Sequence, residues 1–252
     1  MRNGEPFAEG KTKILYTDPN DAGLALMVQK DSISAGDGAR RDVLAGKGAL
    51  SGRTAANIFR LLERAGIPTH FVAAPADDEM VVHRCDMIPL EVVLRRLATG
   101  SYLKRNRESR EGDRFDPVLV EFFLKDDARH DPQVEPEEIV TAGIATVVEI
   151  VEMAERGRQV FDVLERAWAN ERVQLVDLKI EFGRRADGSL VVADMIDNDS
   201  WRLWPDGDKA RMLDKQIYRN MATVTEQGLD QVRQKYAEVA AITDRFGQED
   251  TP

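Results

Sequence analysis

Alternating apolar and polar residues near the N-terminus predict a pair of antiparallel strands. Residues 10–16, with the sequence GKTKILY, form an extended segment that places Lys11 and Lys13 on one face. The turn-forming sequence DPND follows, and Leu24–Gln29 is predicted to be the returning strand. The glycine-rich stretch 34–52 shows neither the period of a strand nor that of a helix, so we predict a loop or a series of tight turns there.

Apolar residues at helical spacing predict the next element. Their stripe runs over residues 50–65, and Gly66 stands where a C-terminal cap belongs. Short strands are predicted at 69–72 and 80–83. The following segment, 87–101, is ambiguous, because its Val-Val pair favours a strand whereas its second half also suits a helix.

The clearest helical pattern covers residues 136–170. This stretch is long enough for two helices, and Gly157 is the predicted break between them. Residues 209–221 and 225–246 are predicted to form two further helices. Strands therefore dominate the first third of the chain, and helices with one β-hairpin dominate the rest. The predicted class is α+β, with two lobes and a cleft between them.

The hairpin begins with residues 176–183, VDLKIEFG, which alternate between apolar and charged side chains. Asp177, Lys179 and Glu181 are expected on one face of this strand and the apolar residues on the other. The lysine lies two residues from the glutamate on the same face, so it is placed to meet an anionic substrate.

The second strand of the hairpin, residues 190–196, begins just after Asp187-Gly188, a pair that two-residue type I′ turns prefer. Such a turn places Glu181 directly opposite Asp194. Like charges that face each other across a hairpin are destabilising by up to about 1 kcal/mol, and a bound Mg²⁺ would relieve the repulsion. The alternative is a solvated strand face whose acids a neighbouring lysine neutralises. The hairpin by itself leaves both interpretations open.

Composition narrows the class of function. The chain has 252 residues, 42% hydrophobic content and a net charge of -10, which argues against a general nucleic-acid binder with its basic footprint. The single cysteine excludes an intramolecular disulfide, and three well-separated histidines disfavour a zinc site. The N-terminal residues lack the apolar core of a signal peptide, and no apolar run approaches the roughly 20 residues of a membrane span. We therefore expect a cytoplasmic protein that binds small anionic ligands and neither nucleic acid nor a membrane.

Basic residues in two places suggest phosphate contacts. Gly10 allows the backbone to approach a phosphate that Lys11 and Lys13 would neutralise, although lysines also guard exposed strand edges. Arg95 lies shortly before a small turn that ends with Ser101, a free hydroxyl. This arrangement suits a phosphate or a carboxylate, and an ordinary salt bridge of the arginine is the alternative.

Two further segments are candidates for ligand contacts. Arg202 lies between two tryptophans in NDSWRLW and suits planar anion recognition, whereas the tryptophans themselves are predicted to be core residues. The segment SAGDGAR, which contains Ser34, Gly36 and Asp37, is either a mobile cover over a ligand or a simple connection.

Five ordered stretches together resemble the SAICAR synthetase (phosphoribosylaminoimidazole-succinocarboxamide synthase) family. They are EGKTKILY, SAGDGAR, MIPLEVVLRRLATGS, VDLKIEFG and DNDSWRLW, and their order and spacing hold over essentially the whole chain. The resemblance implies a two-lobed α+β fold. A small antiparallel β-rich lobe, residues 1–87, would lie over a larger α/β lobe, residues 88–252, with a kinase-like ATP cleft.

The resemblance also implies an activity. The family's enzyme is an ATP-dependent ligase of purine biosynthesis that joins L-aspartate to the carboxylate of carboxyaminoimidazole ribonucleotide (CAIR). The expected route passes through an acyl phosphate and gives SAICAR, ADP and phosphate. ATP and Mg²⁺ are the implied cofactors, and the three substrates are small molecules. A homo-oligomer is possible, with a dimer favoured.

The family motifs carry roles over to individual residues. The implied ATP contacts are Lys11, Lys13, Met87, Glu181 and Asp194, of which Glu181 and Asp194 would also bind Mg²⁺. The implied CAIR contacts are Arg95, Ser101 and Arg202. The residues implied to face the reacting groups are Asp177, Lys179 and Lys13. The residues that bind aspartate are left unassigned, and the candidates are Ser34, Gly36, Asp37, Lys215 and Arg219.

Two departures from the family pattern are visible. Met195 stands where short bacterial members commonly have a glutamate, and lysines that some members carry near Val82 and His83 are absent. The residues by themselves also leave two other functions open. One is a small-molecule kinase on a related two-lobed scaffold, which would need no aspartate, and the other is a non-catalytic nucleotide-binding protein.

Overall fold

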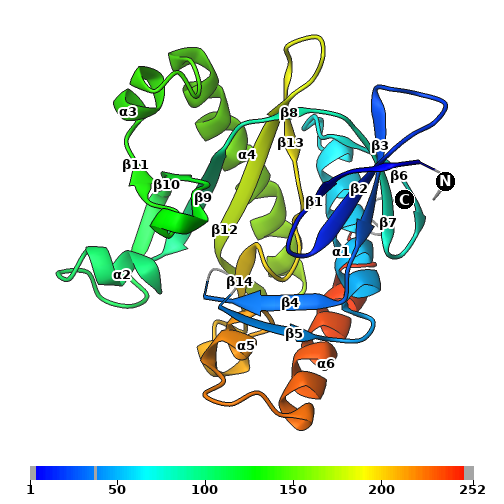
Figure 1. Cartoon of the computed structure of the whole chain (residues 1–252). Coiled ribbons are helices and arrows are strands. Elements are labelled where there is room, and N and C mark those ends of the chain that lie inside the picture. The colour runs from blue at the N-terminus through cyan, green and yellow to red at the C-terminus, as the bar shows by residue number, and fades with distance from the viewer. Residues whose placement is uncertain (1–3, 37–38, 247–252) are drawn as a thin grey trace, which may run out of the picture.

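Two antiparallel sheets carry most of the strands in the computed structural model, which describes residues 4–36 and 39–246. The first sheet belongs to the N-terminal third of the chain and has the strand order β1-β2-β3-β7-β6 (Figure 1). Its strands are β1 (Pro6–Glu9), β2 (Lys13–Thr17), β3 (Leu24–Gln29), β6 (Phe71–Ala76) and β7 (Glu79–His83). The predicted returning strand is confirmed as β3.

β12 (Val173–Arg184) is the centre of the second sheet. β9 and β8 pair with one of its edges, and β14 and β13 pair with the other. The remaining strands of this sheet are β8 (Asp86–Met87), β9 (Leu90–Leu97), β10 (Arg114–Leu124), β11 (Gln133–Val134), β13 (Leu190–Ala193) and β14 (Trp201–Pro205). Because four strands flank β12, side chains on its face have neighbours from several distant parts of the chain.

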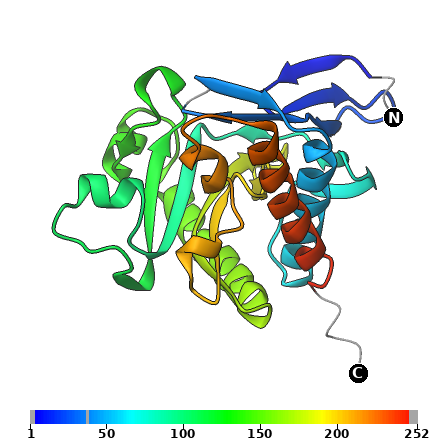
Figure 2. The same cartoon turned by 90° about the horizontal axis from the view of Figure 1, so that it is seen from below.

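The helices pack on the sheets and on each other. The long α4 lies against β12 and β9, α1 lies against the first sheet, and α6 packs beside α1 (Figures 1 and 2). The helices are α1 (Lys47–Arg64), α2 (Ser101–Arg105), α3 (Pro136–Thr141), α4 (Val147–Asn170), α5 (Gln216–Asn220) and α6 (Glu226–Thr243), with 3-10 turns at Asp127–Arg129 and Lys209–Arg211. The molecule is thus an α+β protein, as predicted.

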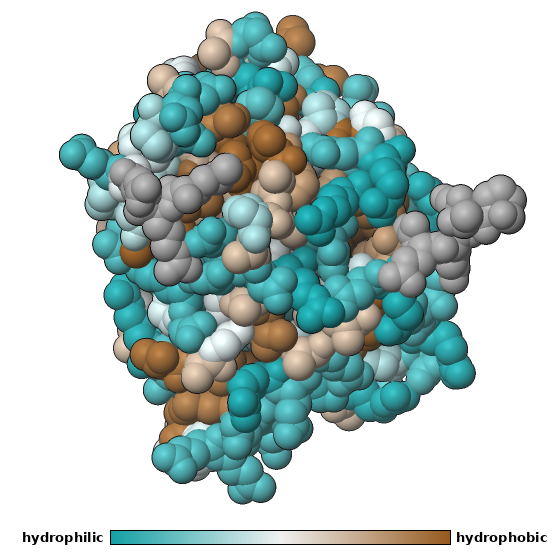
Figure 3. All heavy atoms as spheres, turned by 90° about the vertical axis from the view of Figure 1, so that its right-hand side faces the viewer, coloured by the Kyte–Doolittle hydropathy of each residue, from teal (hydrophilic) through white to brown (hydrophobic). Residues whose placement is uncertain are grey.

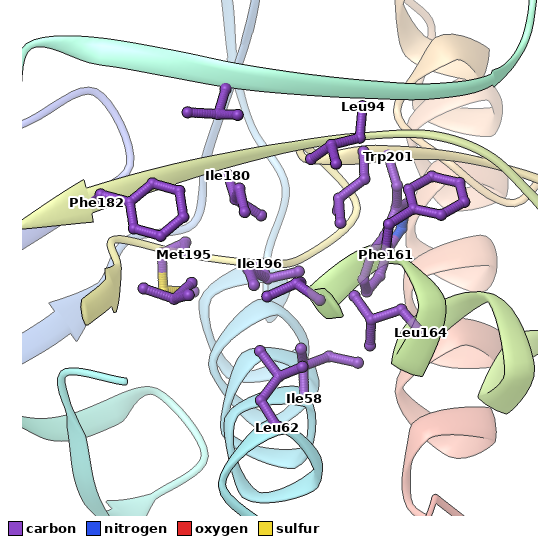
Figure 4. Packing of buried hydrophobic residues seen from close by; sticks show 14 of the residues in the cluster. Ile58, Leu62, Leu94, Phe161, Leu164, Ile180, Phe182, Met195, Ile196 and Trp201 are labelled. Atoms are coloured by element: carbon purple, nitrogen blue, oxygen red, sulfur yellow. The ribbon is translucent and has the colours of Figure 1, made fainter. Parts of the chain in front are cut away.

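One apolar core joins the two sheets. Leu178, Ile180 and Phe182 on the even-numbered face of β12 are at most 1% exposed, which confirms the predicted alternation. They belong to the same buried cluster as side chains of α1 and α4 (Figure 4). Burial of each such side chain contributes about 1.5–3 kcal/mol. The opposite face of β12 is left free for charged residues, and the predicted lobe boundary between residues 87 and 88 stays a prediction.

The helical stretch 136–170 breaks at Gly143, so the predicted break at Gly157 is wrong. Gly143 has a φ of 69° shortly after the end of α3, and the hydroxyl of Thr146 caps α4 by accepting a hydrogen bond from the first turn. Gly157 lies inside α4, where it lets the helix approach the sheet closely. A Cβ atom at this position would lie 3.3 Å from Cδ2 of Leu94.

The stretch 34–52 is not a loop, contrary to the prediction. It holds most of a hairpin, β4 (Ser32–Ala35) with β5 (Arg40–Val43), and the first turns of α1. Within the described chain these two strands pair only with each other. The hairpin lies between the first sheet and α5 (Figure 1). Four-residue strands among glycines are too short to show a period, so the sequence pattern does not reveal them.

The helix predicted at 209–221 is also wrong in extent. Only the 3-10 turn Lys209–Arg211 and the short α5 form there, separated by a stretch that includes Asp214. The Asp214 carboxylate accepts hydrogen bonds from the backbone N–H groups of Leu203 and Gln216, which ties this stretch to β14. The predicted helix at 225–246 is confirmed as α6.

The loop between β12 and β13 is longer than predicted, so the pairing of Glu181 with Asp194 is wrong. The loop spans residues 185–189, and Glu181 faces Ala193 across the hairpin. Asp194 follows the last residue of β13 with a φ of 66°. This left-handed conformation turns the chain out of the strand, so Asp194 reaches the charged face by a bend of the backbone.

The surface fits the acidic, charge-rich composition. The face shown in Figure 3 is mostly hydrophilic, with smaller apolar patches between the polar side chains. Across the described residues, no helix combines the length and the apolar character that crossing a bilayer requires.

The close packing at Gly157 predicts that a large side chain there destabilises the protein. Gly157→Leu should lower the free energy of unfolding by about 1–3 kcal/mol, because the added atoms overpack the contact with β9. Urea denaturation followed by circular dichroism measures this change. Gln159→Leu, on an exposed position of the same helix, is the matched control and should stay within about 0.5 kcal/mol of the wild type. Equal losses in both variants would contradict the packing argument.

Candidate active site

A cleft of three adjoining cavities runs along the charged face of β12. Lys13 and Asp194 line both the first and the second cavity, and Lys179, Asp199 and Arg219 line both the second and the third. The cavities therefore form one continuous site.

Each cavity brings together a different set of the predicted residues. The first is lined by Lys13, Met87, Glu181 and Asp194, with the apolar side chains of Leu15, Ala25, Met27 and Val82. The second, of about 320 Å³, is lined by Lys11, Lys13, Ser34, Gly36, Lys179, Asp194, Lys215 and Arg219. The third is lined by Arg95, Ser101, Asp177, Lys179, Arg202 and Arg219.

Glu181 is a buried carboxylate held by lysines. It is 2% exposed, and its carboxylate oxygens accept hydrogen bonds from Lys179 Nζ at 2.7 Å and from Lys125. Burial opposes the charged form, but the positive charges of Lys179, Lys125 and Lys13 outweigh it and lower the pKa of Glu181 to about 2. The glutamate is therefore ionised at neutral pH.

Lys13 and Asp194 form the second charged pair of the cleft. The ammonium group of Lys13, at the start of β2, contacts the Asp194 carboxylate. Burial, together with the nearby ammonium groups of Lys179 and Lys125, lowers the pKa of Lys13 to about 8 despite the attraction of Glu181. Lys13 is thus mostly charged at neutral pH and titrates at mildly alkaline pH.

Lys179 occupies the middle of the cleft. Besides Glu181, its ammonium group faces Glu91 of β9, with Nζ to Oε1 at 3.4 Å. Burial alone would lower the pKa of Lys179, but the two glutamates raise it above its usual range. Lys179 therefore stays positively charged and lines both the second and the third cavity.

Asp177 lies between two arginines on the neighbouring strands. It pairs across the sheet with Arg95 of β9 and with Arg202 of β14, and its Oδ2 atom accepts hydrogen bonds from Arg95 Nη1 at 3.0 Å and from Arg202. Arg95 is only 3% exposed and also donates to Glu121 at 2.5 Å. Its guanidinium is therefore committed to two carboxylates, whereas Arg202 and Ser101 are the more accessible contacts of the third cavity.

The turn before α2 is shaped around Arg202. Gly100 has a φ of 58°, and a Cβ atom there would lie 2.5 Å from Nη2 of Arg202. The backbone conformation requires glycine at this position, and the Arg202 guanidinium lies close beside it. The predicted core positions of the neighbouring tryptophans are confirmed, since Trp201 and Trp204 are 2% and 6% exposed.

Lys215 reaches the cleft through a network that the sequence did not reveal. Its Nζ donates to Asp199 at 2.7 Å, and the hydroxyl of Tyr236 in α6 donates to the same carboxylate at 2.7 Å. Burial disfavours the charged carboxylate, but Lys47 and Lys215 hold the pKa of Asp199 below its usual range. Asp199 lies within the DNDSWRLW stretch, which was a usable signal, whereas nothing in the sequence pointed to Tyr236.

Lys125 was missed for a different reason. It follows the end of β10, and only the sheet order places that strand end near β12. Lys11, which was predicted to lie on the same strand as Lys13, precedes β2 and pairs with Asp127 at 2.6 Å. Asp37 lies outside the described residues.

The departures from the family pattern also have structural correlates. Met195 is 8% exposed, and its sulfur accepts a hydrogen bond from Gln29 Nε2 at 3.2 Å. No carboxylate stands at that position. Val82 and His83, near which some members have lysines, line the first cavity, and the cationic residues that line it are Lys13, Arg84 and Lys125.

The residues present fit a nucleotide-bound Mg²⁺. In the described part of the chain, no group of three or more histidine, cysteine, aspartate or glutamate side chains is arranged as a metal site. Glu181 and Asp194 line the same cavity, and two carboxylates completed by phosphate oxygens are a usual way to hold this ion. A metal here would therefore depend on the nucleotide.

Comparison with known proteins gives a consistent result. The family model for SAICAR synthetase matches residues 6–236. A phosphoribosylaminoimidazole-succinocarboxamide synthase from Herpetosiphon aurantiacus is 63% identical over 98% of this chain and 100% of its own length. Among solved structures, the enzyme of that name from Ehrlichia chaffeensis has a TM-score of 0.86 at 30% identity over 95% of this chain and 98% of its own.

A second structure bears on the ligand. A SAICAR synthetase in complex with ADP has a TM-score of 0.84 at 33% identity, over 98% of this chain and all of its own. Similarity over nearly the full length, together with the fold and the charged cleft, leads to one conclusion. The chain belongs to the SAICAR synthetase family.

Proposed function

We propose that the cleft joins L-aspartate to the carboxylate of CAIR at the expense of ATP, through an acyl phosphate bound between the second and third cavities. The overall reaction is that of the family and belongs to purine biosynthesis. The observation that carries the proposal is the placement of Lys179, which lines both of these cavities. A fixed positive charge at the junction suits the meeting point of two anions.

The chemistry requires such a charge. A carboxylate is a poor acyl donor because its leaving group would be oxide. Attack of a CAIR carboxylate oxygen on the γ-phosphorus of ATP releases ADP and forms the acyl phosphate. The aspartate amine then attacks the carbonyl carbon, phosphate leaves with that oxygen, and the amine loses a proton. Both steps bring anions together, so they depend on positioning and on compensating charge.

The first cavity is the proposed nucleotide site. Its apolar wall accommodates a flat base, with the Met87 backbone beside it, and Lys13 at its junction with the second cavity faces the phosphates. Lys11 would approach the phosphates from the second cavity. Glu181 and Asp194 would hold Mg²⁺, which supplies additional positive charge when bound. The two carboxylates already sit among lysines, so phosphate can replace carboxylate as the partner of each ammonium group.

The third cavity is the proposed CAIR site. Ser101 and Arg202 are its accessible phosphate contacts, and Arg95 adds positive charge behind Asp177. Asp177 and Lys179 would then face the imidazole and its carboxylate.

We assign the second cavity to aspartate, since the first and third cavities are assigned to the nucleotide and to CAIR. Ser34 and Gly36 form its hairpin side, and Lys215 and Arg219 form the opposite side. Two cationic side chains match the two carboxylates of the substrate. We also propose a cytoplasmic location and a homodimer, as expected for the family.

The reaction is tested by its substrate requirements. Sustained ADP formation by the purified protein should need CAIR and aspartate together, because without aspartate the reaction stops at the acyl phosphate. The product should have the mass of SAICAR. ADP release that persists without aspartate, with a phosphorylated product, would indicate a small-molecule kinase instead. ADP binding without turnover would indicate a non-catalytic nucleotide-binding protein.

The proposed metal ligands predict a sharp loss of rate. Glu181→Gln and Asp194→Asn should each lower kcat by at least about 100-fold with the fold retained, because each removes charge that aligns magnesium and phosphate. Steady-state kinetics and circular dichroism measure both effects. Asp187→Asn, the same change at the exposed loop of this hairpin, is the control and should keep wild-type turnover. Normal turnover in either cleft variant would exclude the metal role.

The lowered pKa of Lys13 predicts a pH dependence of nucleotide binding. Its amine loses its charge as the pH rises through about 8, so the Kd for ADP should rise up to about tenfold per pH unit above that value. Calorimetric titration between pH 7 and 9.5 measures the change. Lys13→Arg stays charged over this range, so its Kd should remain flat. A flat profile for the wild type would show that Lys13 does not hold the phosphates.

A further inference from the structure

The β4–β5 hairpin forms one wall of the second cavity and, among the described residues, shares no backbone ladder with either large sheet. Its Ser32 hydroxyl donates a hydrogen bond to the carbonyl oxygen of Lys11, just before β2, at 2.6 Å. Ser34 and Gly36 come from this hairpin, whose strands pair only with each other within the described residues. The facing wall carries Lys215 and Arg219, at the start and near the end of α5. The width of this cavity therefore depends on what fixes the hairpin relative to α5.

Side chains of β5 make that connection. Arg40 Nη1 donates a hydrogen bond to the carbonyl oxygen of Met221 at 2.6 Å, and Nη2 donates to that of Tyr218. The same guanidinium carbon lies 4.3 Å from the centre of the Tyr218 ring. The Tyr218 hydroxyl donates to Asp42 Oδ2 at 2.6 Å. We call Arg40, Asp42 and Tyr218 the latch.

The latch lies behind the cavity rather than in it. Tyr218 is fully buried in a small cluster with Ile33 and Leu44 from the hairpin side and Val232 and Tyr236 from α6. None of the three latch residues lines the second cavity. They touch the elements that carry the cavity residues, and the carbonyls that Arg40 caps are those at the C-terminal end of α5, next to Arg219.

We propose that Arg40, Asp42 and Tyr218 are positioning residues that set the spacing between the hairpin and α5, and with it the affinity for aspartate. The inference rests on the assignment of the second cavity to aspartate. A dicarboxylate held by cations on one wall and by the hairpin on the other needs both walls at fixed separation. Misplacement by about 1 Å can reduce a rate 100-fold. None of the residues assigned to ATP and CAIR belongs to the hairpin, and Arg219 of α5 lines the CAIR cavity as well.

Neighbouring arginines on β5 allow a matched test. Arg40→Met removes the latch, and Arg41→Met makes the same chemical change at the next residue, which is exposed. Arg40→Met should raise the KM for aspartate about tenfold and leave the KM values for ATP and CAIR within twofold, because only the hairpin side is released. Arg41→Met should match the wild type for all three substrates. Tyr218→Phe keeps the ring, removes only the hydroxyl and should give a smaller rise of the aspartate KM.

Hydrogen exchange of backbone amides measures how firmly the latch holds the hairpin, and it needs no substrate. Amides of residues 32–36 and 39–43 should exchange faster in Arg40→Met and Tyr218→Phe than in Arg41→Met, with α4 unchanged. Unchanged exchange would overturn the latch. Faster exchange with all three KM values raised alike, or none raised, would overturn its role in aspartate binding. If the wild type shows no aspartate-dependent turnover, the proposed function fails, and exchange still decides whether the latch holds the hairpin.

Discussion

Burial of carboxylates on the charged face of β12 is the constraint on which the rest of the site depends. Asp177 and Glu181 are 5% and 2% exposed, and a buried charge without a partner is strongly destabilising. Their partners come from five places: Lys13 of β2, Arg95 of β9, Lys125 after β10, Lys179 of β12 itself and Arg202 of β14. The ion pairs that stabilise these buried carboxylates also bring cationic side chains from both sheets to the charged face of β12. An anionic substrate can then replace a carboxylate as partner of a cation that is already in place.

The faces of β12 could be predicted from the sequence, because strict alternation over eight residues is a strong signal. The approach of Asp194 to the charged face could not be predicted, because it depends on the 185–189 loop and on a left-handed backbone at residue 194. Asp194 lies in the same cavity as Glu181, but the pairing across the hairpin from which this was predicted is wrong. Gly157 shows the same limit, since a glycine inside a helical pattern signals either a break or a close contact, and only the sheet behind the helix decides which.

The second cavity was the least predictable part of the site. The β4–β5 hairpin was not predicted, because its strands are short and lie among glycines. The bend that brings Lys215 to Asp199 was not predicted, because the pattern there indicated one long helix. The family resemblance indicated some of the residues that line this cavity, but it did not indicate which contacts hold the cavity walls in position. The contacts of Arg40, Asp42 and Tyr218 give that account, and they join segments nearly 180 residues apart in the chain.

We propose that this cleft activates a carboxylate by phosphorylating it. Oxygen transfer tests it most directly. With CAIR that carries ¹⁸O in its carboxylate, the phosphate released during turnover is analysed by mass spectrometry. Activation through an acyl phosphate predicts one ¹⁸O atom in each phosphate formed, because the bridging oxygen leaves with phosphorus. Unlabelled phosphate formed together with SAICAR would contradict the account.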